Sequence, residues 1–127
     1  MADNLGRFNR TFKEFVDDLI TVFPNDTQFR MVKLTIGAML MASPNMLYEG
    51  YRDRVALPYG EKILAHDEGF FMDADFNEQT TDIEDAGKVI DRIKQMYRTM
   101  NETNRAVVWK YMRVLTLLSN KISAGAA

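Results

Sequence analysis

Apolar residues recur at steps of three and four along almost the whole chain, and this periodicity is the strongest constraint on the fold. No stretch shows the convincing alternation of a half-buried β-strand. In residues 5–23 the recurring positions make a single stripe with charged residues opposite: Leu5, Phe8, Phe12, Phe15, Val16, Leu19, Ile20 and Phe23. The sequence therefore predicts an all-α protein that begins with an amphipathic helix.

Turn and capping residues divide the first half of the chain into helices. The first helix is expected to end near Phe23-Pro24, and the second to start at Asn25 or Asp26 as N-cap and to run to Ser43. Apolar residues of this second helix occur nearly all round its circumference, so we expect it to be central and buried. A shorter helix should pass through Met46, Leu47, Tyr51 and Val55 and end at a turn over residues 57–60, followed by another over residues 61–72.

The second half of the chain predicts a helical hairpin. From Ile83 to Met100, and again from Val108 to Ile122, apolar residues alternate at three and four, the spacing of a seam between helices. The connection between them is short and polar, which favours antiparallel packing. Residues 1–127 are thus expected to form a single compact bundle of five or six helices ending in an antiparallel helical hairpin, with a frayed tail at residues 123–127.

Composition excludes most familiar catalytic sites. The chain has 127 residues and no cysteine, so disulfides, thiolate nucleophiles and cysteine zinc sites are absent. His66 is the single histidine, which rules out a histidine metal cluster and leaves it as a surface imidazole with acidic neighbours. Neighbouring acids such as Asp17 and Asp18 point about 100° apart on a helix and do not converge on a substrate. We expect a non-enzyme without a cofactor.

Residues 73–84 have the oxygen spacing of a calcium-binding loop, with metal-ligand candidates at Asp73, Asp75, Asn77 and Glu84. However, the position that requires glycine for the sharp turn is Glu78. Thr81 and Glu84 also fit a capping box, in which each side chain satisfies a backbone N–H at the start of a helix. The sequence favours a helix start, with calcium binding as the alternative.

Trp109, the single tryptophan, lies almost opposite the apolar stripe of the last helix, and Arg105 and Arg113 are four residues to either side. Tryptophan flanked by arginine is typical of a protein-interaction hot spot. Two other interpretations stay open. Trp109 could pack beneath another helix of the same domain, or lie under one of the arginines through a cation–π contact.

Charge is distributed unevenly. Residues 60–86 hold nine acids and only Lys62 as a base, whereas residues 87–127 hold eight bases and two acids. This asymmetry fits the electrostatics of helix ends, and it also fits self-association or a protein partner through opposed patches. A nucleic-acid-binding accessory that uses the basic C-terminal hairpin is the alternative, although no known binding motif is present. The sequence has no run of about 18 apolar residues, and its first residues do not resemble a signal peptide. We therefore expect that the protein is neither a membrane protein nor a secreted one.

Three segments carry a resemblance to a known group: "FKEFVDDLITVFPNDTQFRM", "KILAHDEGFF" and "VVWKYMRVLTLLSNK". Together, across roughly residues 8–121, they resemble small uncharacterised helical proteins of nucleocytoplasmic large DNA viruses, especially those of algae. The resemblance implies a viral protein, with a virion or assembly role and a place in the virion or in the host cytoplasm or nucleus. It consists of helical packing positions and transfers no active-site residues.

Overall fold

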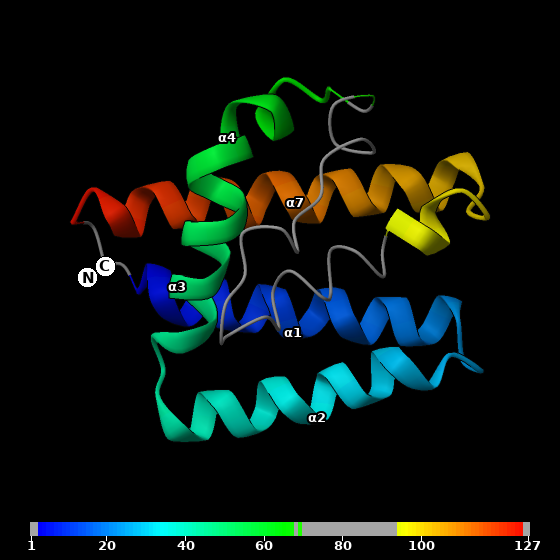
Figure 1. The fold of residues 1–127 in the computed structure, drawn as a ribbon, viewed down its shortest axis with the longest axis horizontal. Coiled ribbons are helices and arrows are strands. Elements are labelled where there is room, and N and C mark those ends of the chain that lie inside the picture. Colours follow the sequence, from blue (N-terminus) through cyan, green and yellow to red (C-terminus); the bar gives the residue numbers. More distant parts are fainter. Residues whose placement is uncertain (1–2, 68, 70–93, 126–127) are drawn as a thin grey trace.

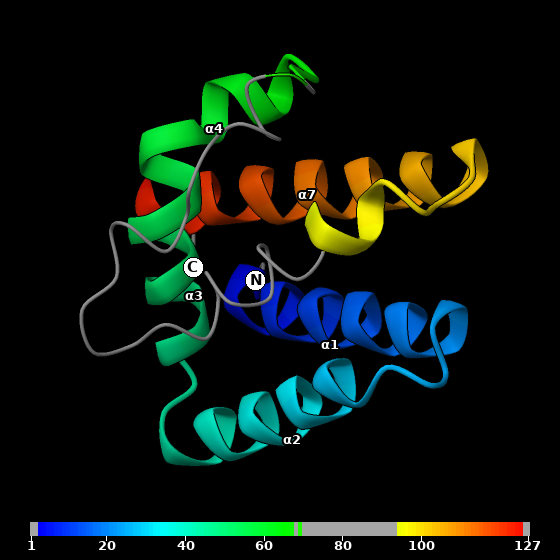
Figure 2. The same ribbon diagram turned by 45° about the vertical axis from the view of Figure 1, so that its right-hand side comes forward.

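Two helices from opposite ends of the sequence lie side by side at the centre of the molecule (Figure 1). The computed structural model describes residues 3–67, 69 and 94–125. Helix α1 (Asn4–Val22) runs antiparallel to α7 (Glu102–Ser123), and α2 (Thr27–Ala42) packs along the other side of α1. A continuous helical run crosses one end of α1 and α7 (Figures 1 and 2). It comprises α3 (Met46–Tyr51), η1 (Arg52–Ala56) and α4 (Leu57–Leu64). The described residues thus form the predicted all-α bundle.

Helix α1 is the element that the sequence predicted best. Asp3 caps its start by accepting a hydrogen bond from the Gly6 backbone N–H at 2.9 Å, and the helix ends at Val22, one residue before Phe23. Its stripe is buried at five of the predicted positions: Phe8, Phe12, Phe15, Val16 and Leu19. These side chains face α7 and the α3 run and supply much of the core.

The predicted bounds of α2 are confirmed, whereas its predicted burial is wrong. Asp26 is the N-cap, with its carboxylate accepting from the Gln28 N–H at 2.9 Å, and the helix ends at Ala42. The helix nevertheless lies in an outer layer of the bundle (Figure 1), and only three of its residues are buried: Phe29, Ile36 and Met39. Many of its other apolar residues are exposed, and among the described helices α2 packs mainly against α1 and α3.

The predicted turn over residues 57–60 is not formed, because the helix continues through Pro58. Proline cannot donate a backbone hydrogen bond to the carbonyl of Arg54, four residues earlier. Immediately before it the chain widens into the π-turn η1, where the Leu57 N–H donates to the Arg52 carbonyl five residues back. Pro58 then occupies the first turn of α4, a position at which the missing N–H is tolerated. The helical direction is therefore maintained to Leu64 without a break.

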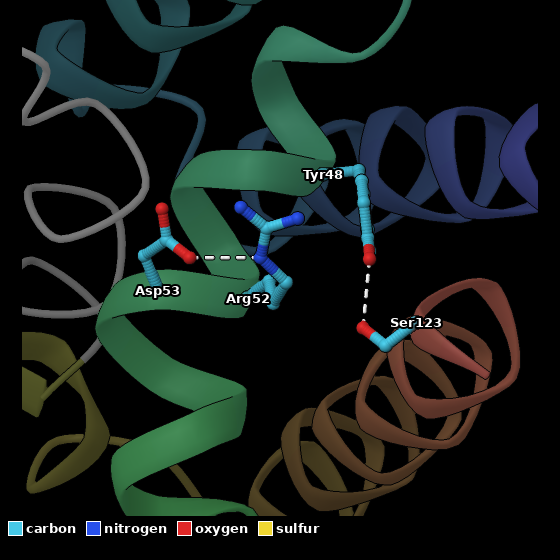
Figure 3. Close-up of polar contacts among 4 residues, drawn as sticks. All are labelled: Tyr48, Arg52, Asp53 and Ser123. Carbon is cyan, nitrogen blue, oxygen red and sulfur yellow. Dashed lines mark hydrogen bonds and ion pairs between the residues drawn. The ribbon is translucent and has the colours of Figure 1, made fainter. Parts of the chain in front are cut away.

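Polar and close contacts fix the helical run against α7. The Tyr51 hydroxyl is buried within hydrogen-bond distance of the Thr116 hydroxyl, at 2.9 Å. Tyr48 makes a similar contact with Ser123 at 2.7 Å (Figure 3). At Gly60, an added Cβ would lie 3.3 Å from the Thr116 methyl group, so the absence of a side chain lets α4 approach α7 closely.

The C-terminal helix begins earlier than predicted. Asn101 caps α7 by accepting from the Asn104 N–H at 2.8 Å, so the polar residues 102–104 form the first helical turn rather than a loop. Of the first arm of the predicted hairpin, the structure describes only residues 94–100, of which 94–97 are helical. The remainder of that arm lies outside the described residues. Helix α7 ends at Ser123, where the frayed tail was expected to begin.

Candidate interaction site

Trp109 is enclosed within its own domain and not displayed on the surface. Its side chain packs between the end of α4 and the turn before α7, and only 6% of the residue is exposed. The indole Nε1–H donates to the Tyr97 hydroxyl at 2.8 Å, and the ring stacks on His66 with centroids 4.1 Å apart. Of the three interpretations open at the sequence level, the structure supports packing within the chain. Because the indole is buried, the structure does not display Trp109 as a surface hot spot, and a role for Trp109 in binding a partner stays a prediction.

The burial of Trp109 was not predicted from the sequence, because α7 buries two adjacent lines of residues. One line faces α1 and contains the predicted stripe residues Val108 and Leu115. The other faces the α4 side and contains Trp109 and Thr116, which are seven residues apart and therefore nearly aligned along the helix. Thr116 is fully buried although it is polar, since Tyr51 satisfies its hydroxyl. A helical-wheel projection that assumes a single buried face does not identify the second buried face.

Arg105 and Arg113 stabilise the surroundings of Trp109. The Arg105 Nε donates to the Tyr97 carbonyl at 3.1 Å, and its guanidinium lies 4.8 Å from the centre of the Tyr97 ring. Arg113 donates to the Leu64 carbonyl at 3.1 Å, at the C-terminus of α4, where the helix dipole favours a cation. The cation–π partner of Arg105 is thus Tyr97, and both arginines act in folding contacts.

His66 ends α4 in a left-handed backbone conformation, with φ 56°. Its N–H donates to the Ile63 carbonyl and the Asp67 N–H donates to the Lys62 carbonyl, the two hydrogen bonds of a Schellman motif. This position usually holds glycine, and a histidine is uncommon there. The imidazole stacks on the Trp109 indole. His66 therefore has a structural explanation, in line with its interpretation as a surface imidazole.

A surface that the sequence analysis did not anticipate lies on α2. Four apolar residues at helical spacing make up what we call the α2 face: Met31, Leu34, Ala38 and Met41. Exposed fractions are 65% for Met31, 75% for Leu34 and 91% for Met41. No charged residue occurs between positions 34 and 42, so this end of the helix offers an apolar, uncharged surface. In the sequence, this surface corresponds to the apolar residues that occur nearly all round the helix, from which we predicted that the helix is buried.

The paired carboxylates of α1 diverge, as predicted. Asp17 forms an ion pair with Lys33 of α2 at 2.8 Å, whereas Asp18 accepts a hydrogen bond from Tyr111 of α7. Burial and the hydrogen bond to Asp18 raise the pKa of Tyr111 to about 12. Burial likewise raises the pKa of Tyr51, with the hydrogen bond to Thr116 opposing it. These groups join helices to one another.

The calcium candidates Asp73, Asp75, Asn77 and Glu84 lie outside the described residues, as does the capping box at Thr81. Within the described ranges, no group of three or more histidine, cysteine or acidic residues could hold a metal ion. In the same part of the chain, no helix combines the length and apolar character that crossing a bilayer needs.

Comparisons with known proteins add no family: no protein-family model, no curated protein and no solved structure matches this chain.

Proposed function

We propose that this protein is a non-enzymatic interaction module that self-associates through the α2 face. The observation that carries the proposal is the exposure of Met31, Leu34 and Met41 on one side of an outer helix. Monomeric proteins expose single apolar residues routinely, but a contiguous apolar patch is typical of a protein-interaction surface. This proposal does not require Trp109 to contact a partner.

A second copy of the chain fits this surface better than a charged partner. The stretch from Leu34 to Ala42 carries no charge, so two copies can meet there without like-charge repulsion. If the two helices pack antiparallel, Arg30 near the start of one helix, whose Nη2 also donates to the Pro24 carbonyl of its own chain, lies toward the C-terminus of the other. That C-terminus has no basic residue in its last turn, so its negative dipole end is free to attract a cation.

The size of the surface indicates a weak dimer. Helix α2 has 16 residues and is therefore about 24 Å long. One helix face of that length provides less than the roughly 800 Å² per partner of a standard stable interface. We therefore expect association that depends on concentration in the micromolar range or above, and that strengthens or stays constant as salt is added, since the contact is apolar.

Light scattering at increasing protein concentration tests the proposal. The wild type should move from monomer toward dimer, and Leu34→Glu should remain monomeric because it places a charge in the apolar contact. Leu57→Glu is the matched control, since Leu57 is an exposed leucine on α4 and lies outside the α2 face. It should dimerise as the wild type does. A wild-type monomer at millimolar concentration would refute self-association. Equal association of the wild type and Leu34→Glu would refute the α2 face.

Salt dependence separates this surface from the opposed acidic and basic regions. Association that disappears as salt rises would point to pairing of residues 60–86 with the basic C-terminal region, and against the α2 face. The nucleic-acid alternative has less support, because Arg105 and Arg113 donate to backbone carbonyls within the chain. A role in virion structure or assembly is a further part of the proposal, and its support is the sequence resemblance alone.

A further inference from the structure

Arg54 is a buried charge that forms no ion pair with any other residue that the structure describes. It lies in the π-turn η1, and only 7% of the residue is exposed. Its Nη1 is sealed from solvent and has no hydrogen-bond partner within the described part of the chain. Because arginine remains charged in proteins, this arrangement is costly unless an anion compensates for it.

The acid nearest in sequence does not supply that compensation. Asp53 is engaged by Arg52, whose Nε donates to the Asp53 carboxylate at 2.8 Å (Figure 3). The hydrogen bond to Asp53 is also the main cause of the raised pKa of Arg52. Three ion pairs occur among residues 3–67, 69 and 94–125, and none includes Arg54: Lys33–Asp17, Arg52–Asp53 and Lys62–Asp67.

The local backbone gives a second reason to look for a ligand at this point. Single π-turns are rare in helices and occur frequently at functional sites, because the widened turn changes the direction in which its side chains project. Pro58 explains why the helix can accommodate such a turn, but a proline needs no buried arginine nearby. Pro58 therefore accounts for the π-turn, but it does not account for the burial of Arg54.

We propose that Arg54 is the centre of a binding site for an oxyanion, held by two parallel hydrogen bonds from the guanidinium. The planar fork of arginine matches the spacing of two oxygens on a phosphate or a carboxylate, and a charge-assisted pair is strongest where water is largely excluded. The ligand class is therefore a molecule that carries a phosphate or carboxylate group. This site is separate from the α2 face and does not depend on self-association.

Thermal unfolding in sodium phosphate, sodium acetate and sodium chloride at equal ionic strength tests the site. A bound anion should raise the wild-type midpoint by about 5 °C at ten times its dissociation constant, relative to chloride. Arg54→Met should lose this response and unfold at a higher temperature than the wild type in chloride, since the unpaired charge is gone. Arg10→Met, at an exposed cation, should keep the response and so controls for general salt effects.

The two anions distinguish the sources of the ligand. A response to phosphate alone indicates a phosphorylated molecule, and a response to acetate as well indicates a carboxylate. Equal behaviour of the wild type and Arg54→Met in all three salts would overturn the proposal. Calorimetric titration of phosphate and acetate into the wild type provides a test that does not depend on the variant folding, and the absence of binding heat for both would also overturn it.

Discussion

Replacement of Trp109 by alanine is the most informative single perturbation of this protein. The indole is almost wholly buried, and burial of that extent makes removal of a large aromatic side chain cost about 3–5 kcal/mol. The lost Nε1–H bond to Tyr97 contributes about 1 kcal/mol of this range, and the stack on His66 contributes about as much. We expect the free energy of unfolding to fall by about 4 kcal/mol, a large share of the roughly 5–15 kcal/mol of a typical domain.

Urea unfolding followed by far-ultraviolet circular dichroism measures this change, since the variant has no tryptophan fluorescence. Both chains should carry Leu34→Glu, so that association does not contribute to stability. Trp109→Phe is the graded comparison: it keeps much of the ring contact and loses the hydrogen bond, so it should cost about 1–2 kcal/mol.

A loss below about 1 kcal/mol for Trp109→Ala would refute the buried position, because exposed substitutions change stability by about 0.5 kcal/mol or less. That result would restore Trp109 as an interaction residue. If the free energy of unfolding falls by the expected amount, weaker self-association of Trp109→Ala would reflect partial unfolding and not the loss of a contact with a partner.

Two further predictions concern the tyrosines that join α7 to the rest of the bundle. Tyr51→Phe should lower the free energy of unfolding by about 1–3 kcal/mol, because it leaves the buried Thr116 hydroxyl without its partner. Adding Thr116→Val should recover part of the loss, and a double-mutant cycle by urea unfolding checks this; strictly additive losses would contradict the coupling. Tyr111 has a folded pKa of about 12 against an ordinary value of 10.0, so its contribution to stability is complete below pH 10 and is lost as the pH rises through 12. Stability between those pH values should therefore fall more steeply in the wild type than in Tyr111→Phe, and phenolate absorbance should show one more tyrosine titrating near pH 12 in the wild type than in Tyr111→Phe; identical pH profiles would contradict the shift.

Local chemistry determined the beginning and end of several helices. Asp26 was one of two N-cap candidates, with Asn25, because either side chain can accept hydrogen bonds from free N–H groups at a helix start, and the structure shows that Asp26 is the cap. The stripe of α1 was equally readable, since a helix with charges on one side has only one face that can be buried. Such features depend on neighbours within one or two turns.

Pro58 illustrates where local rules fail. The sequence around it has strong turn propensity, yet α3, η1 and α4 form one helical run because packing against α7 favours continuation. Tyr48 and Tyr51 anchor that run to Ser123 and Thr116, more than 60 residues away in the sequence. A π-turn accommodates the proline at small local cost, and its position could not be inferred from propensity.

The sequence by itself determined that this chain is an all-α bundle, where its first two helices lie and which residues of α1 enter the core. The tertiary structure decided which of two apolar helices is central: α1 and α7 face each other, and α2 is left outside with Met41 exposed. It also decided that Trp109, on the polar side of its helix, is buried. The reason is that periodicity records how apolar a helix face is, whereas burial depends on how many neighbouring helices cover it, and that number is set by contacts distant in the sequence.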